Sequence, residues 1–318
     1  MLIQNLIPLG SKTTMRIGGK ARYYADILTR KDVEEAWRFA SAATTPGSSL
    51  PSASLPGIPL IVLGGGSNTV FADGVVNALV VRLKNDGMTV DGNIINVGAG
   101  KILASLINDL AKHSLDLSTL TGIPGTIGGA VIMNAGCHGA TISDVVEEVC
   151  TLMPNGEMRT RHSAECAFGV RHSVFQHESE LILSARLALA PGAVRTIRER
   201  MQRHITERRA RQPLQYANCG SVFRNPPKDV AWKLIAEAGL RGLWCGGAQV
   251  SEKHTNFIVN RNGATAADIV ALVDIVQREV LRTSGISLEP ELVVVAVTGS
   301  RHRSRKTDKI QPLPRAGV

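Results

Sequence analysis

The sequence predicts an α+β fold built in three parts, followed by a disordered basic end. Predicted strands and helices alternate along the chain, but short strands dominate the first two-thirds. The chain has 318 residues, which exceeds the usual size of one domain, and its hydrophobic content of 44% is enough to fill real cores.

Strand and helix signals in the first part surround one unusual segment. Ala21–Ile27 is short and extended, and Asp32 is placed to cap a helix over Val33–Ala43. Thr44–Pro59 is rich in proline, glycine and serine, which is typical of a flexible insertion. Leu60–Leu63 then predicts a short buried strand that runs directly into three glycines.

The middle of the chain combines further strands with one amphipathic helix. Ile102–His113 carries leucines and an isoleucine on one face at helical spacing, so we expect a helix there. Strands are expected at Ala78–Leu83, Ile94–Val97, Val145–Met153 and Glu180–Ala188.

The last third is more helical. Thr265 and Asp268 give its longest helix an approximate capping box. The expected elements are an arginine-rich helix at Arg195–Arg209, a helix at Asp229–Ala238 ended by Gly239, a strand at Asn256–Asn260, a helix at Ala266–Thr283 and a strand at Leu292–Val297. The residues after Gly299 show no periodicity.

The positive charge is concentrated in two places. Residues 195–211 hold seven arginines against two glutamates, and residues 301–318 hold six lysines and arginines against one aspartate, out of a net charge of +9. This pattern is typical of a solvated helix face plus a disordered end. The arginine-rich segment would also suit binding of diphosphates or other polyanions. We therefore do not expect nucleic acid binding as the main function.

Composition also indicates a place in the cell. No apolar run approaches the ~18 to 20 residues that cross a bilayer, and the N-terminus lacks the charged region and cleavage site of a signal peptide. The five cysteines are odd in number and form no C-x-x-C pair, which suits reduced thiols. We expect a cytoplasmic protein, as a monomer or weak oligomer, without a membrane partner. The eight histidines form no metal triad, so no metal site is expected.

Two glycine-dense stretches carry the clearest chemical signal. Consecutive glycines after a buried strand let the backbone turn sharply and present N–H groups to an anion such as pyrophosphate, although a tight structural turn explains the first stretch about as well. The second stretch favours a backbone-lined groove for a flat, phosphate-bearing ligand over a loop that crosses another strand. The candidate residues are Gly64, Gly65, Gly66, Ser67 and Asn68 in the first stretch, and Gly122, Pro124, Gly125, Thr126, Gly128, Gly129, Asn134, Ala135 and Gly136 in the second.

A series of further motifs follows in order between residues 10 and 297. Besides GGGSN at 64–68 and GIPGTIGGAVIMNAG at 122–136, they are TMRIGG at 14–19, GSVFRNP at 220–226, GGAQVSEKH at 246–254, NFIVN at 256–260, ATA at 264–266 and LEPE at 288–291. Together they resemble the UDP-N-acetylenolpyruvoylglucosamine reductases (MurB), whose FAD-binding domain belongs to the vanillyl-alcohol-oxidase-like flavoproteins.

The resemblance implies a fold and a reaction. The fold is a two-lobed FAD-binding domain of the PCMH type, at residues 1–74 and 75–205, a smaller α+β substrate-binding domain at 206–300 and a disordered basic tail at 301–318. The reaction is that of a UDP-N-acetylmuramate dehydrogenase of peptidoglycan precursor synthesis. NADPH reduces FAD, and the flavin N5 hydride then reduces the enolpyruvyl group of UDP-N-acetylglucosamine enolpyruvate.

The resemblance also assigns roles to single residues. Arg171 would polarise the substrate carboxylate, a role that suits a guanidinium because it stays charged and binds carboxylates bidentately. Ser221 would donate a proton, which a weakly acidic hydroxyl can do only toward a strongly basic, enolate-like carbon. Glu291 would help to polarise the substrate. Candidate contacts to substrate or pyridine nucleotide are Arg211, Gln212, Asn225, Gln249, Lys253 and His254.

The sequence departs from the family pattern next to Arg171. Val170 stands where relatives usually have tyrosine, and His172 stands where aspartate or asparagine follows. The compact spacing from Arg171 to Ser221 resembles the family branch that lacks an extra tyrosine-bearing loop.

Two other functions would each account for only part of the sequence. A flavoprotein that oxidises an alcohol would share the glycine motifs but not the C-terminal ones. A polyanion-binding protein that uses residues 195–211 and the tail would leave the glycine motifs unexplained.

Overall fold

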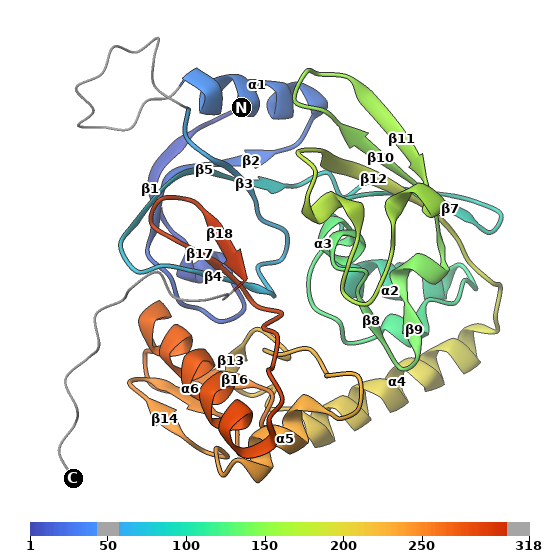
Figure 1. Ribbon diagram of the computed structural model, residues 1–318. Helices are drawn as coiled ribbons and strands as arrows, with labels where there is room; N and C mark the ends of the chain where they lie inside the picture. The colour runs from blue at the N-terminus through green and yellow to red at the C-terminus, as the bar shows by residue number, and fades with distance from the viewer. Residues whose placement is uncertain (43–56, 304–318) are drawn as a thin grey trace.

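The protein consists of three parts arranged around a central junction, as Figure 1 shows. The structure is a computed structural model that describes residues 1–42 and 57–303. Most of the insertion expected at Thr44–Pro59, and the tail beyond Arg303, lie outside the described residues. Within the described ranges, no helix combines the length and apolar character that spanning a membrane requires.

The first part is a four-stranded sheet with one covering helix. Helix α1 (Arg30–Ala42) buries Val33, Ala36 and Ala40 in the hydrophobic core. The strands run in the order β1 (Gln4–Pro8), β2 (Lys20–Ile27), β5 (Val75–Leu83) and β3 (Leu60–Val62), with β1 antiparallel to β2 and the other pairs parallel. The predicted end of the first lobe is residue 74. Because β5 belongs to this sheet, the first part extends past that residue.

A small sheet brings the end of the chain back to the first part. Strand β17 (Val293–Val295) pairs in parallel with β4 (Thr69–Phe71) and antiparallel with β18 (Arg301–Arg303). Figure 1 shows these red strands next to the blue and cyan elements of the first part. The expectation of disorder from residue 301 is therefore wrong for the three residues of β18, whose backbone hydrogen bonds to β17 order them.

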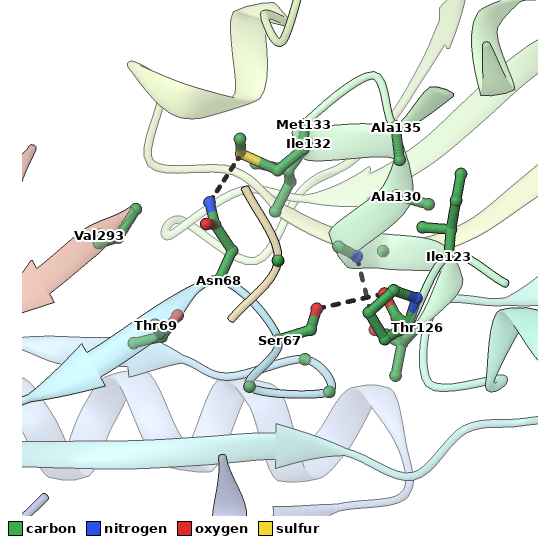
Figure 2. A pocket seen from close by; sticks show the side chains of 18 of the residues that line it. Ser67, Asn68, Thr69, Ile123, Thr126, Ala130, Ile132, Met133, Ala135 and Val293 are labelled. Carbon is green, nitrogen blue, oxygen red and sulfur yellow. Dashed lines mark hydrogen bonds between the residues drawn. The ribbon is translucent and has the colours of Figure 1, made fainter. Parts of the chain in front are cut away.

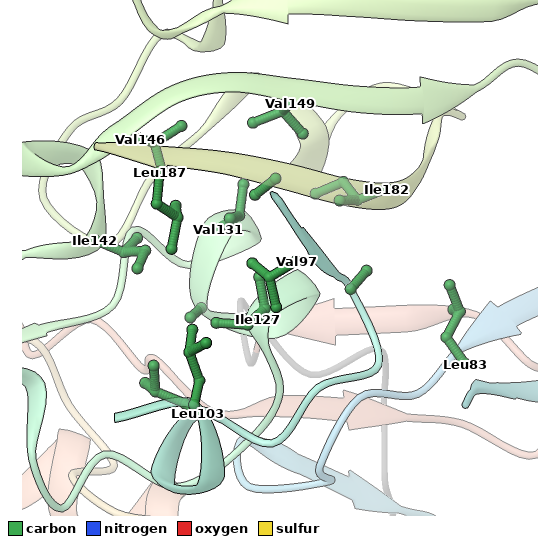
Figure 3. Close-up of a cluster of buried hydrophobic side chains, with 14 of the residues drawn as sticks. Leu83, Val97, Leu103, Ile127, Val131, Ile142, Val146, Val149, Ile182 and Leu187 are labelled. Atoms are coloured by element: carbon green, nitrogen blue, oxygen red, sulfur yellow. The ribbon is translucent and has the colours of Figure 1, made fainter. Parts of the chain in front are cut away.

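The second part is an antiparallel sheet packed on two helices. Figure 3 shows side chains of the sheet, among them Val97, Ile182 and Leu187, gathered around Ile127 and Val131 of the short helix α3. The strand order is β11 (Met158–His162), β10 (Val146–Leu152), β12 (Leu181–Ala188), β7 (Ile94–Gly98) and β6 (Met88–Asp91). The other elements are α2 (Leu103–Lys112), α3 (Ile127–Ile132), β8 (Gly136–Cys137) and β9 (Ala140–Thr141).

The long helix α4 (Val194–Arg211) leads from the second part to the third. In the third part a four-stranded sheet packs against helices α5 (Ala231–Glu237) and α6 (Ala266–Ser284). The strand order is β13 (Ala217–Asn218), β16 (Ile258–Asn260), β15 (Ala248–Val250) and β14 (Trp244–Cys245). Short 3-10 helices occur at Gly10–Lys12, Ser118–Leu120, Ile142–Asp144, Ser163–Cys166 and Val174–Gln176.

Helix ends follow their local sequence signals, with one correction. The capping box of α6 is present: the Thr265 hydroxyl accepts from the Asp268 N–H, and the Asp268 carboxylate accepts from the Thr265 N–H. Asp32, however, does not precede its helix. Helix α1 begins at Arg30, and Asp32 reaches back to accept a hydrogen bond from the N–H of Thr29 at 2.8 Å. Thr29 is the N-cap, and Asp32 is the N3 residue that closes the capping box.

A buried ion-pair network holds one edge of the second sheet. The carboxylate of Glu180 has a side-chain exposure of 0% and accepts hydrogen bonds from Arg161 Nε at 3.1 Å and Thr151 Oγ1 at 2.8 Å. Burial alone would raise the pKa of Glu180, but the hydrogen bonds from Arg161 and Thr151 outweigh it and lower this pKa to about 2.

We expect Glu180→Gln to lower the free energy of unfolding by roughly 3 kcal/mol at neutral pH, because Arg161 loses its main buried partner. The ionised carboxylate stabilises the fold above its ordinary pKa of 4.5, and this contribution is lost as the pH falls toward the folded pKa of about 2. Urea unfolding should therefore show the difference between the two proteins narrowing over that interval.

Glu178→Gln is the matched control, since the Glu178 side chain is 38% exposed and also pairs with Arg161. Glu178→Gln should lower the free energy of unfolding by less than about 1 kcal/mol. Equal decreases in the two variants would contradict the assignment of Glu180 as the main buried partner of Arg161.

Candidate active site

A cavity of about 340 Å³ lies where the three parts meet. This size lies within the range of roughly 300 to 1,000 Å³ that is typical of small-molecule sites. The first part supplies residues 61–69, and the second supplies Arg171 and most of residues 123–137, but not 127, 131 and 134. The third part supplies residues 219–221, and the returning segment supplies Glu291 and residues of β17.

The two glycine-dense stretches form facing walls of this cavity. A Cβ added at Gly65 would lie 2.6 Å from the Cα of Gly125, so a side chain has no room there. The hydroxyl of Ser67 donates to the carbonyl of Pro124 at 3.2 Å, which ties the two loops together (Figure 2). The walls are therefore largely backbone, and this arrangement fits the flat ring and phosphates of FAD.

Asn68 connects the first glycine loop to the end of the chain. Its Nδ2 donates to the backbone carbonyl of Glu291 at 3.0 Å, across 223 residues of sequence, and it also contacts the sulfur of Met133 at 4.0 Å (Figure 2). The backbone carbonyl of Asn68 accepts a hydrogen bond from the N–H of Val293 at 3.0 Å. These bonds fix Glu291 beside the glycine loop.

Arg171 and Glu291 form an ion pair in the wall of the cavity. Arg171 Nε lies 2.8 Å from Glu291 Oε1, and the two side chains are 32% and 15% exposed. The terminal nitrogens of Arg171 donate to the carbonyl of Gly136 at 3.2 and 3.3 Å. A guanidinium has five N–H donors, so two remain for an oxygen of a ligand.

The backbone of Arg171 is held in an uncommon conformation. Its φ of +52° lies in the left-handed region, which costs energy for a residue other than glycine. Gln176 and Arg224 donate to the Arg171 carbonyl at 3.0 and 3.2 Å, and Asn134 donates to the carbonyl of Gly169 at 3.0 Å. These three side chains fix the turn that presents the guanidinium.

Ser221 reaches the same cavity from the third part. The next residue, Val222, donates to the carbonyl of Asn256 at 2.9 Å and accepts from the N–H of Glu291 at 2.7 Å. These bonds place the backbone of Ser221 beside that of Glu291. The structure thus brings Arg171, Ser221 and Glu291 into one cavity, while their catalytic roles stay predictions.

The cysteines in the cavity wall are neutral thiols. Burial raises the pKa of the Cys219 thiol to about 12. Burial also raises the pKa of Cys137, and nearby arginines offset this only in part. We therefore expect no thiolate nucleophile at this site.

Most residues predicted to bind the cofactor line the cavity. Gly122 and Asn134 do not: Gly122 lies against the side chain of Arg208, and Asn134 is 5% exposed and holds the turn near Arg171. Those that line it are Gly64, Gly65, Gly66, Ser67, Asn68, Pro124, Gly125, Thr126, Gly128, Gly129, Ala135 and Gly136.

The residues predicted to bind substrate are more dispersed. Of the six, all within the described residues, only Gln212 lines the main cavity. Gln249 and Lys253 line a second cavity of about 100 Å³ in the third part, and Lys253 Nζ donates to the carbonyl of Arg209 at 2.6 Å.

The other three lie outside both cavities. Asn225 accepts a hydrogen bond from the N–H of Ala231 at the start of α5, and Arg211 is exposed at the end of α4. His254 packs edge-on against Phe257, and burial lowers its pKa. A role in substrate binding stays a prediction for all of them.

Two arginines of the cavity wall were missed by sequence reasoning. Arg301 belongs to β18 and has no local signal. Arg208 belongs to the arginine-rich helix α4, and its inward-facing position can be predicted from the sequence. It follows Met201 by seven residues and Ile197 by eleven, and these are the two buried apolar residues of that helix. Helical spacing therefore places Arg208 on the inward face.

The described residues include one cluster of possible metal ligands. His138, His204 and Glu207 place ligand atoms within 4.8 Å of one another. The two imidazole rings, however, stack at 3.7 Å between centroids with an angle of 28°. Ring nitrogens direct their lone pairs in the plane of the ring, so stacked rings do not converge on one ion, and we assign no metal here.

Comparison with known proteins gives a consistent result along most of the chain. Residues 23–161 match the family model of an FAD binding domain, and residues 212–295 match that of the UDP-N-acetylenolpyruvoylglucosamine reductase C-terminal domain. The predicted α+β fold, an FAD-binding domain followed by a smaller C-terminal domain, is confirmed.

Whole-chain relatives agree with these matches. The chain is 38% identical over 295 residues to UDP-N-acetylenolpyruvoylglucosamine reductase 2 of Symbiobacterium thermophilum, covering 92% of each protein. It is 39% identical over 289 residues to the reductase of Moorella thermoacetica, covering 90% of this chain and 91% of that protein. The crystal structure of the reductase (MurB) from Thermus caldophilus matches with a TM-score of 0.76 and 33% identity, over 92% of this chain and 99% of that one.

The close approach of the two glycine loops gives a direct test of the cofactor site. Gly65→Ala should weaken FAD binding by at least about tenfold, because the added methyl group pushes against the backbone of Gly125. The measurement is a titration of deflavinated protein with FAD, followed by flavin fluorescence. Gly87→Ala is the control, since a Cβ there meets nothing within 4 Å. Unchanged FAD affinity in Gly65→Ala would exclude this wall as the binding surface.

Proposed function

This chain belongs to the UDP-N-acetylenolpyruvoylglucosamine reductase family, and from that premise we propose that NADPH is its reductant and that Arg171, Ser221 and Glu291 carry the reaction. The protein is an FAD-dependent oxidoreductase of peptidoglycan synthesis. Its reaction reduces the enolpyruvyl group of a UDP-amino sugar to give UDP-N-acetylmuramate. We further propose that it works in the cytoplasm.

One observation supports the assignment of the reacting groups. Arg171, Ser221 and Glu291 come from three separate regions of the sequence, yet they line the same cavity as the two glycine loops. The two glycine loops would hold FAD, and the cofactor would supply the hydride chemistry when bound. The side chains must then bind the substrate, stabilise developing charge and deliver a proton.

Arg171 suits the binding of the substrate carboxylate. Addition of hydride to the vinyl carbon places negative charge on the neighbouring carbon and on its carboxylate. The two N–H groups of Arg171 that remain can donate to those oxygens, and the guanidinium charge stabilises them. Glu291 fixes the orientation of the guanidinium through the ion pair, so little reorganisation is needed when charge develops.

Ser221 suits the delivery of the proton. Its hydroxyl can protonate only a strongly basic centre, and the carbon next to the carboxylate becomes one after hydride addition. The hydrogen bond from the Glu291 N–H to the Val222 carbonyl holds the segment of Ser221 next to that of Glu291, and both residues line the cavity. A single site would therefore hold the cation and the proton donor together.

The proposed function is tested by oxidation of NADPH in the purified yellow protein. We expect rapid NADPH oxidation only when UDP-N-acetylglucosamine enolpyruvate is present, with UDP-N-acetylmuramate as the product. NADH in place of NADPH is the comparison that tests the reductant. Oxidation that is independent of the UDP-sugar would overturn the proposal.

Replacement of Ser221 tests the proton donor. In Ser221→Ala, reduction of the flavin by NADPH should survive, while reduction of the UDP-sugar should fall by roughly 100-fold or more, because only the second step needs the proton. Stopped-flow absorbance of the flavin measures each half-reaction separately. Equal impairment of both steps would show that Ser221 has a structural role instead.

A further inference from the structure

Arg208 is a cation in the cavity wall that has no counter-ion within residues 1–42 and 57–303. It projects from the inward face of α4, is partly buried, and lines the main cavity. Among the described residues, none forms an ion pair or hydrogen bond with its guanidinium. Arg171, in contrast, is neutralised by Glu291, and Arg200 on the same helix pairs with Asp116 at 2.5 Å.

The surroundings of Arg208 make this charge costly. Burial lowers the pKa of its guanidinium, because the charged form loses contact with water. A partly buried charge without a partner destabilises a fold, so such residues are usually paired. A partner that arrives with a ligand would remove the cost.

The second glycine loop is shaped to admit the Arg208 side chain. Gly122 has a φ of +93°, and a Cβ added there would lie 2.9 Å from Cδ and 3.2 Å from Nη1 of Arg208. The Arg208 side chain therefore lies directly against the second glycine loop at Gly122. A side chain at this position would be strained by its φ and would also press on Arg208.

We propose that Arg208 is an anion-binding residue of the cavity and that its guanidinium pairs with the diphosphate group of a bound nucleotide. Arginine is suited to this contact because its N–H groups form a fork that binds two phosphate oxygens at once. The diphosphate can come from FAD or from the UDP-sugar. The second source rests on the proposed function, whereas the first requires only that FAD binds.

The first experiment compares flavins with and without phosphate groups. Deflavinated Arg208→Gln protein is titrated with FAD and with riboflavin, which has the same ring system but no phosphate. If the partner is the FAD diphosphate, FAD affinity should fall at least about tenfold while riboflavin affinity is unchanged, and Arg208→Lys should restore part of the loss. An equal loss for both flavins would show a merely structural role and overturn the proposal.

The second experiment addresses the UDP-sugar in the FAD-loaded enzyme. If the partner is the substrate diphosphate, Arg208→Gln should raise KM for the UDP-sugar at least about tenfold, with kcat and FAD affinity little changed. If neither FAD affinity nor KM changes, the proposal is wrong. Failure of the proposed function would instead appear as absence of UDP-sugar reduction in the unaltered protein, and the flavin titrations would still report on Arg208.

Thermal unfolding separates this proposal from simple damage to the fold. Removal of an unpaired buried charge should leave the Tm of the deflavinated Arg208→Gln protein equal or higher. If FAD is the partner, the increase in Tm on adding FAD should be smaller than in the unaltered protein. Arg203→Gln is the matched control, since Arg203 is exposed on the same helix and should change none of these quantities. A lowered Tm in Arg208→Gln without ligand would contradict the unpaired charge.

Discussion

The parallel pairing of β17 with β4 is the constraint on which the rest of the site depends. It joins the segment that follows Glu291 to β4, the strand that follows the first glycine loop. The Val293 N–H and the Asn68 side chain then secure the position of Glu291. The returning segment is also held by the hydrogen bond from the Glu291 N–H to the Val222 carbonyl, and Arg224 of the third part donates to the Arg171 carbonyl, so these contacts together place Glu291 beside Arg171.

Charge in the cavity is organised in two ways. The pair of Arg171 and Glu291 is neutral as a whole, and its remaining N–H donors are aimed by hydrogen bonds to the backbone. Because the guanidinium is already oriented, such a pair can stabilise negative charge that develops during a reaction without a large movement of its side chains. Arg208 has no counter-ion in the part of the chain that the structure describes, which suits a group that is anionic before and after the reaction. If both proposals hold, permanent and developing negative charge have different partners.

The elements that could be predicted from the sequence are those that local patterns determine. The apolar face of Ile102–His113 and the capping box at Thr265 gave helices with nearly correct ends, because both signals lie within a few residues. The strand at Arg301–Arg303 was missed because it exists only through pairing with β17. The grouping of Arg171, Ser221 and Glu291 came from the resemblance alone. Contacts across more than 50 residues have no periodicity that a single sequence reveals.

Val170 departs from the family pattern beside a residue whose geometry is well fixed. Val170 is 87% exposed, at the tip of the turn between Gly169 and His172. The hydrogen bonds that fix Arg171 come from Gln176 and Arg224 to its backbone carbonyl, and from Asn134 to the preceding turn. None of them involves the side chain at position 170. The direction of the Arg171 guanidinium therefore does not depend on a tyrosine there, and this departure from the family pattern leaves the ion pair with Glu291 intact.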